Sequence, residues 1–234
     1  MMDDIELVVF DLAGTTIEDA GEVPEAFTAS LQAHGLNVTS EAINAVRGAS
    51  KREVIRRFVE NQFPQEAPNN VARTEKIFDA FRQRLSEIYQ SRGVKEIPGT
   101  TETFAWLRRR NIKIGLNTGF DREVTQLILQ AVNWSNDLVQ AVVCGDDVAQ
   151  GRPAPYLIFH AMEATGVVDV SHVANVGDTT LDLQAGRNAG VRWNVGVFSG
   201  AHRKKQLEKL QPTHLLASVA ELPMLMTSSR RDLV

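Results

Sequence analysis

The sequence predicts an α/β protein with a parallel sheet and an all-helical segment inserted after the first strand. Two observations lead to this prediction. Beyond residue 98, short apolar runs alternate with helical patterns, which is typical of consecutive βαβ units. Between residues 24 and 93 the chain shows only helical periodicity, although a strand-like run precedes it. The helical block therefore separates the first strand of the sheet from the others.

The first half of the chain is expected to contain one strand and four helices. The strand covers Ile5 to Phe10 and ends at an aspartate. The helices are expected over residues 24–34, 40–46, 50–62 and 71–92. We predict a core domain formed by residues 1–16 and 98–226, a helical cap domain over residues 17–97, and a loosely ordered tail over residues 227–234.

The second half is expected to alternate between helices and strands. A helix from Pro98 ends in the basic run 108–110, where cations favour the helix dipole. Right-handed crossovers would place all the strands of this half in one parallel sheet. Strands are expected over residues 112–117, 139–144, 172–176 and 191–197, with helices starting at Asp121, Pro153 and Thr179.

Composition limits the classes of partner and compartment. The chain has 234 residues, of which 43% are hydrophobic and 23% charged, as in ordinary soluble domains. A net charge of −4 gives no basic field, so we expect neither nucleic acid nor an anionic membrane as partner. A single cysteine, Cys144, fits a reducing compartment, and no signal peptide or membrane-length apolar run is present in the sequence. We therefore expect a cytoplasmic protein.

Polar residues follow the first two expected strands. Asp11, in FDLAGTT, ends the first strand, where ligands of open α/β sheets bind, so it is a candidate nucleophile or metal ligand. A turn residue is an equally good interpretation of Asp11 alone. Thr118 and Gly119 follow the next strand and precede a helix, a position that suits an anion.

Two further polar motifs occupy later strand ends. Arg152, followed by Pro153, places a fixed cation where it can bind phosphoryl or carboxylate oxygens, or simply lie at the rim. Asp178 and Asp182 lie four residues apart where a strand leads into a helix, so both carboxylates can face one point. Such oxygen ligands suit Mg²⁺. Asp178 alone is equally consistent with a helix N-cap.

The four motifs, in this order, resemble those of the haloacid dehalogenase superfamily of phosphotransferases and hydrolases. The resemblance covers essentially the whole chain and implies a Rossmann-like core with a helical cap inserted after the first motif. It also implies that an aspartate attacks phosphorus beside a Mg²⁺ ion. The resemblance implies that Asp11 is the nucleophile. It implies metal binding by Asp11, by the carbonyl of Ala13 and by Asp178, with support from Asp182. It implies substrate binding by Thr118, Gly119 and Arg152.

Position 13 departs from the pattern of the phosphatases in this superfamily. These usually carry a second Asp two residues after the nucleophile, which protonates the leaving group; here that residue is Ala13. Loss of a general acid typically costs a factor of about 10² to 10⁴. The DxAGT motif and the Arg before Pro are similar to those of phosphonoacetaldehyde hydrolases, in which a cap lysine forms an imine and the leaving carbon departs as an enamine.

Lys51 falls where the imine-forming lysine of these phosphonatases lies, at the start of a cap helix after Ser50. Such a lysine must be partly neutral near pH 7, and Arg47 and Arg52 are neighbouring cations that would lower its pKa. A solvated first-turn lysine is the alternative. Arg47 and Val54 stand where the phosphonatase pattern has Met and His.

The resemblance thus predicts a Mg²⁺-dependent hydrolase that cleaves the carbon–phosphorus bond of a small phosphonate, similar to phosphonoacetaldehyde, through an aspartyl-phosphate. Asp11 and Lys51 would be its catalytic residues. Three alternatives stay open: a phosphatase of a small phosphorylated metabolite, a 2-haloacid dehalogenase, and a binding module without activity. Dehalogenases generally dispense with Mg²⁺, so the presence of the acidic pair Asp178 and Asp182 disfavours the dehalogenase alternative. A small phosphonate or phosphate is the expected partner, and a homodimer is allowed for.

Overall fold

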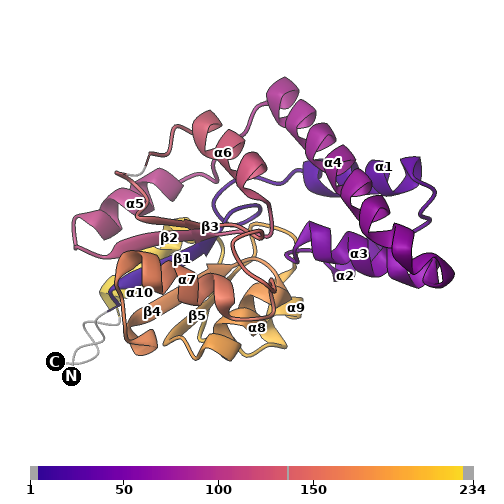
Figure 1. Cartoon of the computed structure of the whole chain (residues 1–234). Helices are drawn as coiled ribbons and strands as arrows, with labels where there is room; N and C mark the ends of the chain where they lie inside the picture. The colour runs from indigo at the N-terminus through magenta and orange to yellow at the C-terminus, as the bar shows by residue number, and fades with distance from the viewer. Residues whose placement is uncertain (1–4, 136, 229–234) are drawn as a thin grey trace.

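The computed structural model of the chain describes residues 5–135 and 137–228. These residues form a parallel sheet flanked by helices, and a helical insertion projects from the end of the sheet at which the first strand finishes (Figure 1). The strand order of the described sheet is β3-β2-β1-β4-β5-β6. The strands are β1 (Leu7–Asp11), β2 (Lys113–Asn117), β3 (Ala141–Val143), β4 (Val173–Gly177), β5 (Trp193–Val197) and β6 (His214–Leu216).

The first strand of the chain lies in the middle of the sheet. β1 pairs with β2 and β4, with Asp11 beside Asn117 and Phe10 beside Val176. All five residues of β1 are buried, as expected of a strand covered on both faces. Because the strand order reverses between β1 and β4, the carboxyl end of β1 lies at the point where open α/β sheets bind ligands.

Helices cover both faces of the sheet. Successive side chains of β1 point to opposite faces: Phe10 contacts the Phe104 ring at 5.2 Å between centroids, whereas Val9 packs in a second apolar cluster with α7 and α8. α5, α6 and α10 contribute to the first cluster. The helices are α5 (Thr100–Arg108), α6 (Arg122–Ala131), α7 (Tyr156–Thr165), α8 (Thr180–Ala189), α9 (Lys204–Glu208) and α10 (Leu222–Ser228).

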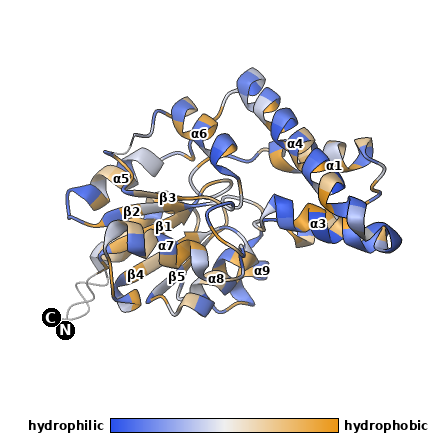
Figure 2. Ribbon diagram, viewed as in Figure 1, coloured by the Kyte–Doolittle hydropathy of each residue, from blue (hydrophilic) through white to orange (hydrophobic). Residues whose placement is uncertain are grey.

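The insertion is helical throughout its described residues. Its longest helix is amphipathic, with polar and apolar residues alternating around it in Figure 2. On its buried side, Phe81 meets Phe27 of the first helix edge-on at 5.6 Å between ring centroids. The elements are α1 (Glu22–Ala33), α2 (Ser40–Ala45), α3 (Lys51–Gln62) and α4 (Ala67–Arg92), with a 3₁₀ turn over Pro64–Glu66. We call residues 22–92 the helical insertion.

Several element boundaries differ from those expected. The helix predicted from Pro153 begins at Tyr156, because Arg152 to Pro155 form a turn before it. β6, α9 and α10 were not predicted. α10 includes Thr227 and Ser228, whose hydroxyls donate to backbone carbonyls one turn earlier, so these two residues do not belong to a loosely ordered tail.

The rest of the predicted tail, residues 229–234, and the first four residues of the predicted core lie outside the described residues. The exact limits of the core and cap domains stay predictions. Among the described helices, none combines the length and the apolar character that a membrane span requires.

Candidate active site

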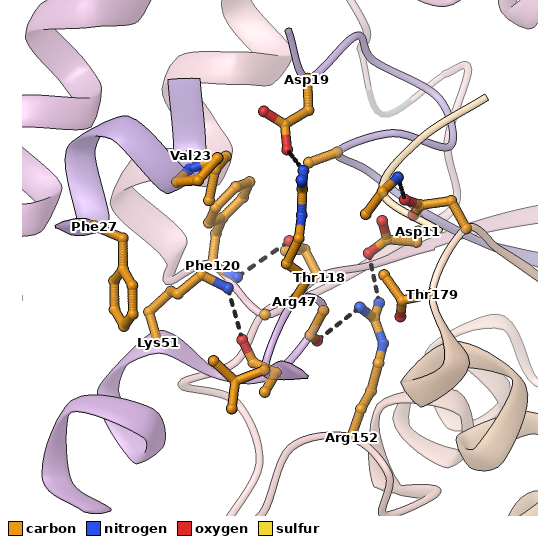
Figure 3. A pocket seen from close by; sticks show the side chains of 18 of the residues that line it. Asp11, Asp19, Val23, Phe27, Arg47, Lys51, Thr118, Phe120, Arg152 and Thr179 are labelled. Carbon is orange, nitrogen blue, oxygen red and sulfur yellow. Dashed lines mark hydrogen bonds and ion pairs between the residues drawn. The ribbon is translucent and has the colours of Figure 1, made fainter. Parts of the chain in front are cut away.

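A pocket opens where the carboxyl ends of the central strands meet the helical insertion (Figure 3). The core lines it with six residues predicted for the site, and the insertion adds Lys51. The six core residues are Asp11, Ala13, Thr118, Gly119, Arg152 and Asp178. Asp182 does not line the pocket but contacts Arg152 directly behind it. The structure therefore brings the four strand-end motifs and the insertion lysine together.

Asp11 is a buried carboxylate with one cationic partner. Its residue is 5% exposed, and its Oδ1 lies 2.7 Å from Nη2 of Arg152. Burial raises the pKa of Asp11 to about 7; the Arg152 charge opposes this shift and the Asp182 charge adds to it. The hydroxyl of Thr16 donates to the Asp11 carbonyl at 2.9 Å, which fixes the backbone after β1. The nucleophile candidate is thus held rigidly in a poorly solvated position.

Asp178 follows β4 and is also fully enclosed. Its Oδ1 accepts a hydrogen bond from the Thr15 hydroxyl at 3.0 Å, and its Oδ2 accepts one from the Ala201 amide at 2.6 Å. Burial raises its pKa well above the ordinary value, and the charges of Asp11 and Asp182 raise it further. Two separate loops therefore hold this carboxylate in one orientation.

Asp182 has two structural partners. Its Oδ2 accepts from the Thr179 amide at 2.9 Å, and the Thr179 hydroxyl in turn accepts from the Asp182 amide, which makes a capping box at the start of α8. Thr179 is therefore the N-cap, and the alternative that Asp178 is the N-cap is wrong. The other oxygen of Asp182 lies 3.0 Å from Nε of Arg152.

Arg152 links the core carboxylates to the insertion. Its Nη2 contacts Asp11 and donates to the backbone carbonyl and the side chain of Asn117, and its Nη1 donates to the Gly48 carbonyl at 3.2 Å. Burial disfavours its charge, but Asp182 and Asp11 outweigh burial, so the pKa of Arg152 is raised. In this arrangement Arg152 binds carboxylates, and its contact with a phosphoryl group stays a prediction.

The three carboxylates fit a divalent cation. Oxygen atoms of Asp11, Asp178 and Asp182 lie within 4.8 Å of one another, and all three residues are buried. Arg152 balances one of their negative charges when all are ionised, so two charges are left in a region of low polarity. An oxygen-only donor set of this kind suits Mg²⁺. Because Asp11 and Asp178 line the pocket and Asp182 does not, Asp11 and Asp178 are the better candidates for direct ligands.

Thr118 and Gly119 form the part of the pocket after β2. The Thr118 hydroxyl accepts a hydrogen bond from the Phe120 amide at 3.1 Å, which leaves its own hydrogen for a ligand. A Cβ on Gly119 would lie 2.8 Å from the Ala49 carbonyl oxygen, so the absence of a side chain allows the insertion to approach this strand end.

Lys51 is buried, so the alternative of a solvated first-turn lysine is wrong. It is the first residue of α3 and 7% exposed. Its Nζ donates to the Ala49 carbonyl at 3.0 Å and lies 5.9 Å from the centroid of the Phe27 ring. Burial lowers the pKa of Lys51 to about 8, more than any single charge does.

The charges around Lys51 act in both directions. Asp19 and Asp11 raise its pKa, whereas Arg47 and Arg152 lower it. The expected effect of Arg47 is therefore confirmed. Arg52, the other cation expected to lower this pKa, instead forms an ion pair with a glutamate in an exposed position.

Sequence reasoning missed an ion pair and an apolar wall of the pocket. Asp19 lies between β1 and α1, and its carboxylate pairs with Arg47. The apolar wall includes Val23, Phe27, Ile43 and Phe120. No sequence signal marks these residues, because the packing of the insertion on the core brings them together. Cys144 is buried, and burial raises its pKa to about 11.

Comparison with known proteins identifies the family of the chain. Residues 8–197 match the family described as haloacid dehalogenase-like hydrolase. A phosphonoacetaldehyde hydrolase of Bacillus cereus is 33% identical over 210 residues, which cover 84% of this chain and 77% of that protein. A phosphonoacetaldehyde hydrolase of Bacillus anthracis is 30% identical over 224 residues, covering 90% and 84%.

Solved structures show the same fold. A phosphonoacetaldehyde hydrolase-like protein from Oleispira antarctica has a TM-score of 0.81 and 25% identity, with 98% of this chain and 94% of that chain covered. A hydrolase from Pseudomonas syringae has a TM-score of 0.81 at 19% identity, with 95% and 98% covered. The chain therefore belongs to the haloacid dehalogenase-like hydrolases, and among them it resembles the phosphonoacetaldehyde hydrolases.

Proposed function

We propose that the protein is a Mg²⁺-dependent hydrolase that cleaves the carbon–phosphorus bond of a small phosphonate with a carbonyl group on its second carbon, as in phosphonoacetaldehyde. One observation carries the proposal: the buried amine of Lys51 and the buried carboxylate of Asp11 line the same pocket. Ala13, which offers no acid to a leaving group, lines it too. The names of the relatives with 30 to 33% identity support the same chemistry.

The first step would be imine formation. The neutral Nζ of Lys51 adds to the carbonyl carbon, and loss of water gives a protonated imine. A lysine with a pKa of about 8 is neutral in roughly one molecule in ten at pH 7. An ordinary lysine, with a pKa near 10.4, is neutral in roughly one in 2,500. Burial of Lys51 thus supplies the reactive form.

The second step would transfer the phosphoryl group. A carboxylate oxygen of Asp11 attacks phosphorus, and the electron pair of the carbon–phosphorus bond moves onto carbon, where the protonated imine accepts it to give an enamine. Departure as an enamine needs no proton at the leaving atom, so Ala13 is compatible with it. The enamine carbon then takes a proton from water, and hydrolysis of the imine releases the aldehyde and restores Lys51. Water cleaves the aspartyl-phosphate to release phosphate.

The other residues would hold the reacting groups. When bound, Mg²⁺ neutralises the phosphoryl oxygens, with Asp11, the Ala13 carbonyl and Asp178 as its protein ligands. The Thr118 hydroxyl would donate a hydrogen bond to one phosphoryl oxygen, and the Gly119 amide would donate one to another. Arg152, held by Asp182, keeps the Asp11 carboxylate in one orientation.

Phosphate release and covalent trapping test the proposal. Purified protein with Mg²⁺ and phosphonoacetaldehyde should release inorganic phosphate, and EDTA should stop it. Addition of borohydride should reduce the imine and leave an adduct on Lys51, detected by mass spectrometry. Lys51→Arg, which keeps the charge, is the matched control and should give no adduct. An unmodified lysine together with no phosphate release would remove the proposal.

The same material separates the alternatives. A phosphatase would hydrolyse simple sugar phosphates briskly and give no adduct with borohydride. A 2-haloacid dehalogenase would release chloride from 2-chloropropionate at a rate that EDTA does not change.

A further inference from the structure

Asp19 and Arg47 form an ion pair inside the pocket, beside Lys51 (Figure 3). Asp19 comes from the segment between β1 and α1, and Arg47 from the loop between α2 and α3. The Asp19 side chain is 4% exposed and that of Arg47 is 23% exposed. The proposed mechanism uses neither residue, although both line the site.

This pair changes the charge that the insertion offers to a ligand. Arg47 and Lys51 are the cations that the insertion contributes to the pocket lining, and Asp19 is the carboxylate beside them. Because Asp19 neutralises Arg47, Lys51 is the cation left for the organic end of a ligand, and in the proposed reaction its amine becomes part of the imine. A second anionic group on the ligand would therefore meet a carboxylate at the guanidinium that the insertion contributes.

The apolar wall of the pocket also disfavours a second anionic group on the ligand. Four apolar residues line the pocket from the insertion and from the loop after β2, and each is at least 93% buried. They are Val23, Phe27, Ile43 and Phe120. A carboxylate placed against such side chains loses hydration without gaining hydrogen bonds, which is costly. An uncharged group of similar size loses much less.

We infer that Asp19 is a specificity-determining residue: by neutralising Arg47 it restricts the site to phosphonates whose organic part is uncharged, and excludes those with a second anionic group. The inference rests on the proposed phosphonate site, but it concerns binding and not carbon–phosphorus cleavage. Freed from Asp19, the Arg47 guanidinium would be available to bind a carboxylate in a bidentate manner.

Two unreactive ligands of equal size test the inference. Phosphonoacetate and phosphonoacetamide differ only in a carboxylate against an amide. Their affinities would be measured by isothermal titration calorimetry with Mg²⁺ present at about pH 9, where the Lys51 amine is mostly neutral and does not pair with the carboxylate. The proteins compared are wild type, Asp19→Asn, and the double variant Asp19→Asn/Arg47→Met. Asp79→Asn, which removes a carboxylate from an exposed Asp–Arg pair elsewhere on the insertion, is the matched control.

Wild type and the control should bind the amide at least tenfold more tightly than the carboxylate. Asp19→Asn should tighten phosphonoacetate binding at least tenfold and change phosphonoacetamide binding less than threefold, and the double variant should lose this gain. The inference is overturned if wild type prefers the carboxylate, if Asp19→Asn changes both affinities equally, if the double variant retains the gain, or if neither ligand binds. The phosphate-release assay decides separately whether the protein cleaves phosphonates.

Discussion

Gly48 and Thr179 face each other across the junction between the helical insertion and the sheet: a Cβ on Gly48 would lie 2.4 Å from the Thr179 hydroxyl oxygen. Gly48 also has a φ of +84°, which favours glycine. The loop that carries Arg47 and leads to Lys51 therefore docks on the core by direct backbone contact, and no side chain fits between them.

Gly48→Ala should disturb this junction more than a comparable change elsewhere. Gly35→Ala is the matched control, because Gly35 has a φ of +77° and no heavy atom lies within 4 Å of its added Cβ. The control should lose about 1–2 kcal/mol of unfolding free energy from backbone strain alone. Gly48→Ala should lose more and should lower kcat/KM at least tenfold, since Lys51 moves with the loop. Chemical denaturation and steady-state kinetics measure both; equal losses in the two variants would contradict the prediction.

Lys51→Met should stabilise the protein while abolishing activity. The folded pKa of about 8 lies below the ordinary value of 10.5, so burial of the protonated amine costs about 3 kcal/mol below pH 8, where both states bind the proton. Between pH 8 and 10.5 the unfolded state binds more protons than the folded state, and the wild type gains stability as pH rises. The variant should therefore unfold at higher denaturant concentration at pH 7, by up to about 3 kcal/mol.

The advantage of Lys51→Met should shrink as pH rises from 8 to 10.5, because the wild-type amine becomes neutral. Lys204→Met, at a side chain that is 60% exposed, should show no such pH-dependent gap. A constant difference between Lys51→Met and wild type over this pH range would argue that the amine is not buried in its charged form.

The pH dependence of trapping should report the same amine. The yield of the borohydride adduct on Lys51 at short times should rise with pH and level off above about pH 8, where the amine is neutral. Because the Asp19 charge raises the pKa of Lys51, Asp19→Asn should move this rise to lower pH. Mass spectrometry of quenched samples gives the yields; a shift to higher pH would contradict the assigned charge effect.

Ala13→Asp should create phosphatase activity. The new carboxyl group would stand two residues after the nucleophile, lining the pocket beside Asp11, where it can protonate an alkoxide. General acid catalysis contributes about 10²- to 10⁴-fold, so hydrolysis of small phosphate esters should rise within that range. Ala13→Asn, similar in size but unable to donate a proton from a carboxyl group, should not raise it. Rapid hydrolysis of these esters by the wild type would contradict the prediction.

Mg²⁺ should stabilise the folded protein through the carboxylate cluster. At a concentration of 100 times its Kd, a ligand adds about 2.7 kcal/mol to the unfolding free energy, which raises the melting temperature measured by calorimetry. Asp178→Asn should reduce this gain, because it removes a carboxylate from the cluster. Asp169→Asn, at the start of a 3₁₀ turn outside the cluster, should keep it. An equal gain in Asp178→Asn and wild type would place the metal elsewhere.

The sequence predicts most of the sheet because the strands next to β1 are buried on both faces and read as apolar runs. β6 was not predicted because it does not form such an apolar run. It lies at the edge of the sheet and has three residues, of which only Leu216 is buried. The predicted boundary of α7 is wrong because proline suits an early helical position, whereas here the chain turns from Arg152 to Pro155 before the helix begins.

The core part of the site was predictable because parallel strands place their carboxyl ends at one edge of the sheet, so that motifs far apart in sequence meet there. The environment of Lys51 was not, since a lysine after a Ser N-cap is ordinarily solvated. Its burial depends on how α3 and Phe27 of α1 pack against the core. The same long-range packing creates the Asp19–Arg47 pair, which no local pattern indicates.

The central place of β1 has a consequence for how the chain folds during synthesis. The strand that ends in Asp11 has no neighbour in the sheet until residues 113–117 have left the ribosome, and its second neighbour follows only at residues 173–177. The helices of the insertion contact one another over shorter sequence separations, so they can assemble while β1 is still unpaired. A nascent chain shorter than about 180 residues therefore cannot hold a complete reaction centre, and the ribosome-bound protein stays inert until its second half has emerged.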